Sequence, residues 1–162
     1  MENKPYYEQE YHEDKSDIPR PTFGQVFKLL FTAPFKWNAR STRRGFWYSY
    51  IWSIILLFIL AACSAFSFAN DGVPYSSDEF FLLTHASIGT VITQVIIYIF
   101  IIWILLGLLG FTVRRLHDTD HTGWWYWLTV IPFGYLFLLY FMVLPTVERP
   151  VRWGGYLFKE KK

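Results

Sequence analysis

The middle of the sequence carries very little charge. Between Gly45 and Val113 there is no lysine or arginine, and the only acids are Asp71, Asp78 and Glu79. Over all 162 residues the charged fraction is 17%, below the roughly 25% of soluble globular domains. Apolar stretches of this length are too long to be faces of a soluble core. The shortage of charge therefore argues against a soluble enzyme.

The sequence also has little cysteine, and its first residues do not resemble a secretory leader. The chain has one cysteine, Cys63, so an internal disulfide is impossible. Residues 1–20 hold six acids, three bases and two prolines without an apolar run, which is unlike a secretory signal. We therefore expect the first apolar segment to act as its own insertion signal. Residues 1–21 are expected to form a disordered cytoplasmic tail.

The bases that are present are strongly segregated. Of the 15 lysines and arginines, eight lie in residues 1–44, none in 45–113, two at positions 114–115 and five after residue 144. Such clustering is typical of membrane proteins, whose cytoplasmic loops are enriched in bases. It requires no nucleic acid as a partner.

Residues 22–34 have the pattern of a short amphipathic helix. Phe23, Val26, Phe27 and Leu30 recur at the spacing of one helix face, and Thr22 is placed to cap the first turn. A helix of about 12 residues cannot cross a bilayer, which needs about 20. We therefore expect it to lie in the headgroup region.

Three longer apolar segments follow, at residues 46–69, 88–113 and 123–144. Their lengths predict three transmembrane helices. With the interfacial helix they predict an all-α integral membrane bundle over residues 22–158, followed by a basic C-terminal end at 159–162. Pro132 and Gly134 lie in the middle of the third segment and predict a kink or a break there.

The bases allow two topologies. Three full spans with a cytoplasmic N-terminus place ten bases inside and five, all in the C-terminal tail, outside. A re-entrant hairpin at Pro132 would bring all 15 bases to the inside. We favour three spans, because irregular backbone at membrane depth must be buried in protein, and a small chain supplies little. The hairpin stays open as the alternative.

The polar residues after the second segment are concentrated in one loop. On a helix that continues past the membrane, the Asp118 carboxylate can hold Arg115 or Arg114 at three or four residues' spacing. His117 and His121 with nearby acids could bind a metal, His117 and Asp118 could act as acid and base, and the arginines could gather anionic lipid headgroups. A structural corner stabilised by its own ion pairs is favoured over all three.

Two motifs carry a family resemblance. Residues 37–47, WNARSTRRGFW, resemble an entry motif FSGRASRREYW, and residues 114–125 contain RRLHDT followed by TGWW, which is similar to RRLHDT…SGWW. Both belong to the bacterial inner-membrane family called domain of unknown function 805. The resemblance covers roughly residues 23–156. It implies a small multi-span protein of the bacterial plasma membrane and no established activity.

We interpret the chain as a non-enzymatic plasma-membrane component with a cytoplasmic N-terminus, contacting anionic lipid or a membrane partner protein, with self-association possible. No catalytic, cofactor or metal site is predicted. A subunit of a small oligomeric transporter or channel is the alternative, and an enzyme using His117 and Asp118 ranks third. The candidate residues all lie at membrane boundaries: Arg40, Arg43, Arg44, Trp47, Arg114, Arg115, His117, Asp118, Gly123, Trp124 and Trp125.

Overall fold

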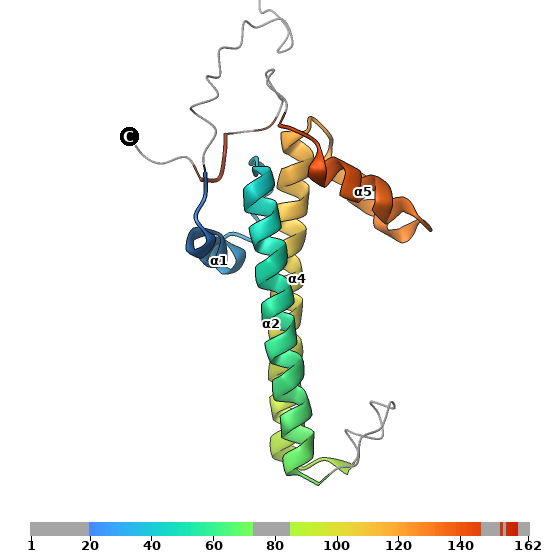
Figure 1. Cartoon of the computed structure of the whole chain (residues 1–162). Coiled ribbons are helices and arrows are strands. Elements are labelled where there is room, and N and C mark those ends of the chain that lie inside the picture. Colours follow the sequence, from blue (N-terminus) through green and yellow to red (C-terminus); the bar gives the residue numbers. More distant parts are fainter. Residues whose placement is uncertain (1–19, 73–84, 147–152, 154, 159–162) are drawn as a thin grey trace, which may run out of the picture. The chain divides into compact units, whose positions relative to one another are not determined.

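The computed structural model describes residues 20–72, 85–146, 153 and 155–158. All regular elements in these ranges are helices, which confirms the all-α prediction (Figure 1). They are α1 (Phe23–Thr32), α2 (Arg43–Asn70), α4 (Ile88–Asp118), the 3-10 helix η3 (Gly123–Val130) and α5 (Gly134–Val143). Two compact units share α2 and α4: the first holds residues 20–50 and 106–158, and the second holds residues 51–105.

The short helix α1 begins with a complete capping box. The Thr22 hydroxyl accepts from the Gln25 backbone N–H, and the Gln25 side chain accepts from the Thr22 N–H. This satisfies two backbone donors that a helix start otherwise leaves unpaired. Val26 and Leu30 are fully buried in the first unit, so α1 uses part of its apolar face to pack against protein.

Two helices, rather than the three predicted from the sequence, are long and apolar enough to cross a membrane in the described part of the chain. They are α2, with 28 residues, and α4, with 31 residues. Only 6% and 33% of their most apolar 18-residue stretches is buried, and Phe58 is 75% exposed. The core helix of a soluble protein would hide most of such a stretch. The exposure therefore indicates association with a membrane.

Within the second unit α2 and α4 run antiparallel and are joined by polar side chains. Ser64 donates to the Gln94 side-chain oxygen at 3.0 Å, and Ser67 donates to the Thr90 hydroxyl at 3.3 Å. At the end of the pair, the Asp71 carboxylate accepts from the backbone N–H and hydroxyl of Ser87, just before α4 begins. Hydrogen bonds from Thr90 and Ser87 lower the pKa of the Asp71 carboxyl. These four side chains, Ser64, Ser67, Thr90 and Gln94, form a polar seam between two otherwise apolar helices.

Gln94→Leu is expected to loosen this helix pair. Gln94 is buried, and its amide exchanges hydrogen bonds with Ser64 of α2. Leucine would remove this contact, and such contacts between helices in a membrane are worth about 0.6–2 kcal/mol. The measurement is the unfolding free energy in detergent. Thr93→Val is the matched control, since the exposed Thr93 hydroxyl bonds within its own helix to Gly89. Equal stability of the two variants would contradict the assigned role of the seam.

The third apolar segment is two short helices instead of one helix over 123–144. The chain leaves η3 at Val130 and begins α5 at Gly134, and Phe133 between them has a left-handed φ of 63°. Pro132 lies in this break, as expected from a residue that lacks a backbone N–H and cannot continue a helix. Thr122 stands at the N-cap of η3, but its side chain makes no capping hydrogen bond there.

Two predicted segments lie outside the described residues. They are all but the end of the N-terminal tail predicted at 1–21, and the basic C-terminal end at 159–162.

Candidate functional site

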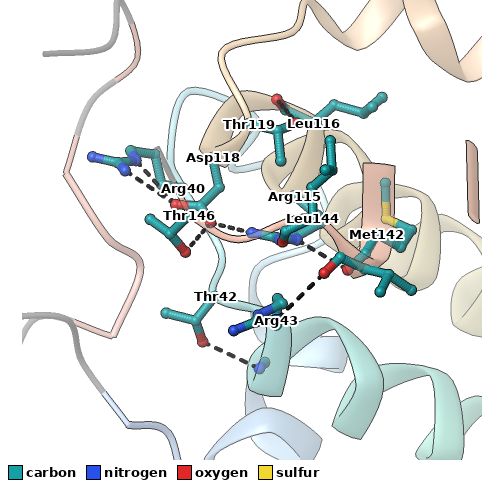
Figure 2. Close-up of polar contacts among 12 residues, drawn as sticks. Arg40, Thr42, Arg43, Arg115, Leu116, Asp118, Thr119, Met142, Leu144 and Thr146 are labelled. Atoms are coloured by element: carbon teal, nitrogen blue, oxygen red, sulfur yellow. Dashed lines mark hydrogen bonds and ion pairs between the residues drawn. The ribbon is translucent and has the colours of Figure 1, made fainter. Parts of the chain in front are cut away.

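The strongest polar cluster surrounds Asp118, the last residue of α4. The fully buried carboxylate accepts at Oδ1 from Nε and Nη2 of Arg40, at 3.2 and 3.1 Å. Its Oδ2 pairs with Nη1 of Arg115 and accepts from the Thr146 hydroxyl at 2.8 Å. Figure 2 shows these contacts converging from three parts of the chain. Arg40, Arg115, Asp118 and Thr146 are called the Asp118 cluster below.

Arg115 also holds the end of α5. Its Nη2 donates to the Leu144 carbonyl oxygen, and its Nε donates to the Met142 carbonyl oxygen at 3.4 Å (Figure 2). Arg43 reaches the Val143 carbonyl oxygen, also at 3.4 Å. The last carbonyls of a helix lack partners and carry partial negative charge, so arginines stabilise them. The i, i+3 pair of Arg115 and Asp118 predicted from the sequence is confirmed.

Arg114 does not pair with Asp118, although the i, i+4 spacing allowed it. Its fully buried side chain donates instead to the carbonyl oxygens of Ala33, at 2.8 Å, and Lys36, at 3.4 Å. The guanidinium also stacks over Phe111, with Cζ 4.4 Å from the ring centre. Arg114 and Arg115 therefore point to different elements: one holds the end of α1 and the other holds the end of α5.

Glycines let α1 and the chain after it approach α4 closely. A Cβ on Gly107 would lie 2.5 Å from the Leu30 carbonyl oxygen, and one on Gly110 would overlap the Pro34 carbonyl oxygen. Both obstacles are backbone atoms, which cannot rotate away. These two glycines therefore serve packing within the first unit, and they are not an open face for another helix.

The segment after residue 152 returns to the same place. The backbone N–H of Arg40 donates to Gly155, and the backbone N–H of Leu157 donates to Arg40, which forms an isolated parallel bridge at Tyr156. The Arg40 guanidinium lies 4.6 Å above the Tyr156 ring. Trp153 stacks on His117 with ring centres 3.7 Å apart. Arg40 thus links the N-terminal motif, α4 and the C-terminal segment.

The candidate residues divide into two groups. Three arginines, Arg40, Arg114 and Arg115, are buried with His117 and Asp118, so the motif forms an internal cluster. The remaining ones lie wholly or partly at the surface, namely Arg43, Arg44, Trp47, Gly123, Trp124 and Trp125. The sequence analysis placed all the arginines together at an interface and did not separate these groups.

Among the surface residues, the two tryptophans differ in contact. Trp124 is 77% exposed. Trp125 packs edge-on against His121 and Phe141, with ring centres 5.6 and 5.5 Å apart. Gly123 sits where a Cβ would come within 3.0 Å of Val113. Close contact with α4 therefore accounts for the glycine at the start of η3.

The side chains considered for acid–base or metal chemistry are held in other contacts. Both Asp118 oxygens are occupied by cluster partners, and the His117 ring is covered by Trp153, so the two side chains do not face one shared space. Within the described ranges, no group of three histidine, cysteine or acidic side chains is arranged to hold a metal ion. What the arrangement does is join distant segments by charge-assisted hydrogen bonds.

Sequence reasoning missed five residues of the site. Thr146, Trp153 and Tyr156 lie after the two sequence motifs, and their partners are more than 25 residues away. Gly107 and Gly110 lie inside the apolar run of α4, where a glycine alone does not indicate a contact. Their spacing of three on an apolar helix is the one signal that could have pointed to the close approach of another element.

One comparison with known proteins gives a match. The family described as "Protein of unknown function (DUF805)" matches residues 34–155, which include both sequence motifs and the whole Asp118 cluster. No curated protein and no solved structure matches the chain.

Proposed function

The chain belongs to the DUF805 family, and from that premise we propose that it is a non-enzymatic component of the bacterial plasma membrane that binds anionic lipid headgroups. In this proposal α2 and α4 cross the bilayer, the N-terminus is cytoplasmic, and the exposed arginines of the entry motif contact lipid. The buried arginines hold the protein together. The single observation that carries the proposal is this division of the arginine motifs into buried and exposed members.

Membrane insertion is supported by the exposed apolar surface of α2 and α4. Apolar side chains are exposed along both helices, for example Phe58, Phe66 and Ile99. Burying such surface in lipid contributes roughly 25 cal/mol per Å2 of apolar area. The polar side chains of the seam face the partner helix, where they satisfy one another away from lipid.

Arg43 and Arg44 are placed where helix energetics disfavour them. They open α2, its first turn contains no acid, and positive charge there opposes the helix dipole by about 0.3–1 kcal/mol. Both side chains are exposed, unlike Arg40 three residues earlier. An anionic group outside the protein would offset this cost, and the headgroups of the cytoplasmic leaflet supply such groups.

The neighbouring surface fits the headgroup level. Lys36 is exposed, and so are Phe35 at 59% and Trp37 at 47%. Aromatic residues with bases beside them are typical of the membrane–water interface. The orientation with these bases in the cytoplasm follows the positive-inside rule.

We propose a non-enzymatic role because the two residues suggested for catalysis, His117 and Asp118, already make structural contacts. His117 and Asp118 are the acid–base pair that the sequence suggested, and each is engaged by a different partner. A catalytic role would require both to be released from buried contacts before they could meet a substrate.

Removing the exposed charges tests the lipid contact. Arg43→Gln with Arg44→Gln is expected to lower the preference for anionic over zwitterionic phospholipid by roughly 30-fold, since each base near an anionic surface contributes about 1 kcal/mol. The preference is measured for the purified full-length protein in nanodiscs of mixed lipid composition.

The matched control is Arg43→Lys with Arg44→Lys, which keeps both charges and should bind nearly as the native protein does. Thermal unfolding of both variants separates lost binding from lost folding. Native lipid preference in the folded glutamine variant would refute the lipid proposal.

A further inference from the structure

The two ends of the third apolar segment, residues 123–144, meet at the same place. Trp125, near its start, packs on Phe141, near its end, with ring centres 5.5 Å apart. His121 lies 4.3 Å from the same ring. Just beyond the end, Thr146 donates to Asp118, which lies before the start. The segment therefore leaves the end of α4 and comes back to it.

Each half of the segment is too short to cross a bilayer. The ten residues of α5 rise about 15 Å, and the eight residues of η3 rise about 16 Å. The hydrocarbon core is about 30 Å thick. Either half reaches roughly the middle of the bilayer and no further.

A sharp apolar turn joins the two halves. Phe133 is 71% exposed with a left-handed φ of 63°, and Val130 and Ile131 are 73% and 57% exposed. A Cβ on Gly134 would overlap the Leu128 carbonyl oxygen. The first residue of α5 therefore lies directly against the backbone of η3 at the turn. The turn carries no ionised side chain that would oppose entry into lipid.

The apolar exposure is spread over both halves. Trp124, Trp127, Leu136, Phe137 and Tyr140 are between 50% and 77% exposed. A protein partner covers one face of a hairpin, whereas lipid chains surround it. The distribution fits the hydrocarbon of a bilayer as the occupant.

We propose that residues 123–144 form a re-entrant hairpin inserted into the cytoplasmic leaflet, so that the C-terminal segment lies on the same side as Arg40. The proposal rests on the membrane location proposed above and adds the number of crossings. The backbone bridge between Arg40 and Tyr156 joins the two ends directly. With two crossings and one hairpin, all 15 lysines and arginines lie on the cytoplasmic side.

The earlier objection to a hairpin was the lack of protein to bury irregular backbone. At the end of α5 this objection does not hold, because the side chains of Arg115 and Arg43 donate to the carbonyl oxygens of residues 142–144. In the turn, the backbone N–H of Ile131 donates to Leu128, and that of Gly134 donates to Ile131. These hydrogen bonds satisfy backbone groups in the turn and at the end of α5.

The number of crossings is tested with reporter fusions. A fluorescent protein that matures only in the cytoplasm and a phosphatase active only outside are each fused to residue 162 and, separately, inserted at Gly72. We expect cytoplasmic signal at residue 162 and external signal at Gly72. External signal at residue 162 would overturn the hairpin while leaving the membrane location intact, and recovery of the protein in the soluble fraction would overturn the proposed function itself.

The depth of the turn is tested with Phe133→Cys in a Cys63→Ser background. A fluorophore on this cysteine should be quenched at least threefold more by lipids spin-labelled on the acyl chain than by headgroup-labelled lipids. Trp37→Cys is the control, and headgroup-labelled lipids should quench it more. Rapid labelling of Phe133→Cys by a membrane-impermeant maleimide would place the hairpin on the surface and overturn its insertion.

Discussion

Asp118→Asn is expected to destabilise the protein by about 3–5 kcal/mol, the usual cost of removing one partner from a buried ion pair. Asparagine keeps the size of the side chain but leaves the guanidiniums of Arg40 and Arg115 without a carboxylate in a buried site. Chemical unfolding of the purified protein in detergent gives the change in free energy. Because this is a large share of the 5–15 kcal/mol typical of folded proteins, reduced accumulation in cells is also expected.

A double-mutant cycle separates the ion pair from general disruption at this position. Once Asp118 is asparagine, Arg40→Met should cost much less than it does in the native protein, because the charge pair is already broken. His117→Ala is the neighbouring control and should cost less than Asp118→Asn, since it removes the stacking on Trp153 and backbone hydrogen bonds but leaves no buried charge without a partner. Additive effects of Arg40→Met and Asp118→Asn would count against the cluster.

Gly110→Ala is expected to destabilise the first unit by 1–3 kcal/mol or more, although alanine favours helices. The added methyl group would overlap the Pro34 carbonyl oxygen and come within 2.9 Å of Arg114 Nη2, so the chain after α1 must move away from α4. That movement also strains the hydrogen bond from Arg114 to Ala33. Thermal unfolding and limited proteolysis near α1 measure the effect.

Gly24→Ala is the matched control for this substitution. Gly24 lies within α1, and a Cβ there would meet nothing within 4 Å. The change should stabilise α1 by up to about 1 kcal/mol through helix propensity alone. If both alanine variants were stabilised, the close approach of α4 to the Pro34 region would be wrong.

The two predictions assign a mainly structural role to the buried residues of the two sequence motifs. Arg40, Arg114 and Arg115 each hold a different segment against the end of α4. Because these three side chains are buried, the proposed lipid contact does not involve them. Arg43 and Arg44 are the exposed arginines at the start of α2, and Arg43 also donates to the Val143 carbonyl oxygen.

The local part of the site could be predicted from the sequence. The pair of Arg115 with Asp118 follows from helical spacing, and the capping box at Thr22 follows from residue types three positions apart. The partners of Arg114 could not be predicted, because a carboxylate four residues away and a helix end 81 residues away compete for the same guanidinium. Only the packed position of α1 decides between them.

The sequence by itself determined the helical class, the apolar character of α2 and α4, and the break at Pro132, because length, hydropathy and proline chemistry act over one to twenty neighbouring residues. The tertiary structure alone decided that the third segment folds back and that its ends meet at Asp118. Three spans and a hairpin have the same local pattern. They differ only in whether Phe141 lies beside Trp125 and Thr146 beside Asp118, and those contacts join residues that spacing along the chain cannot relate.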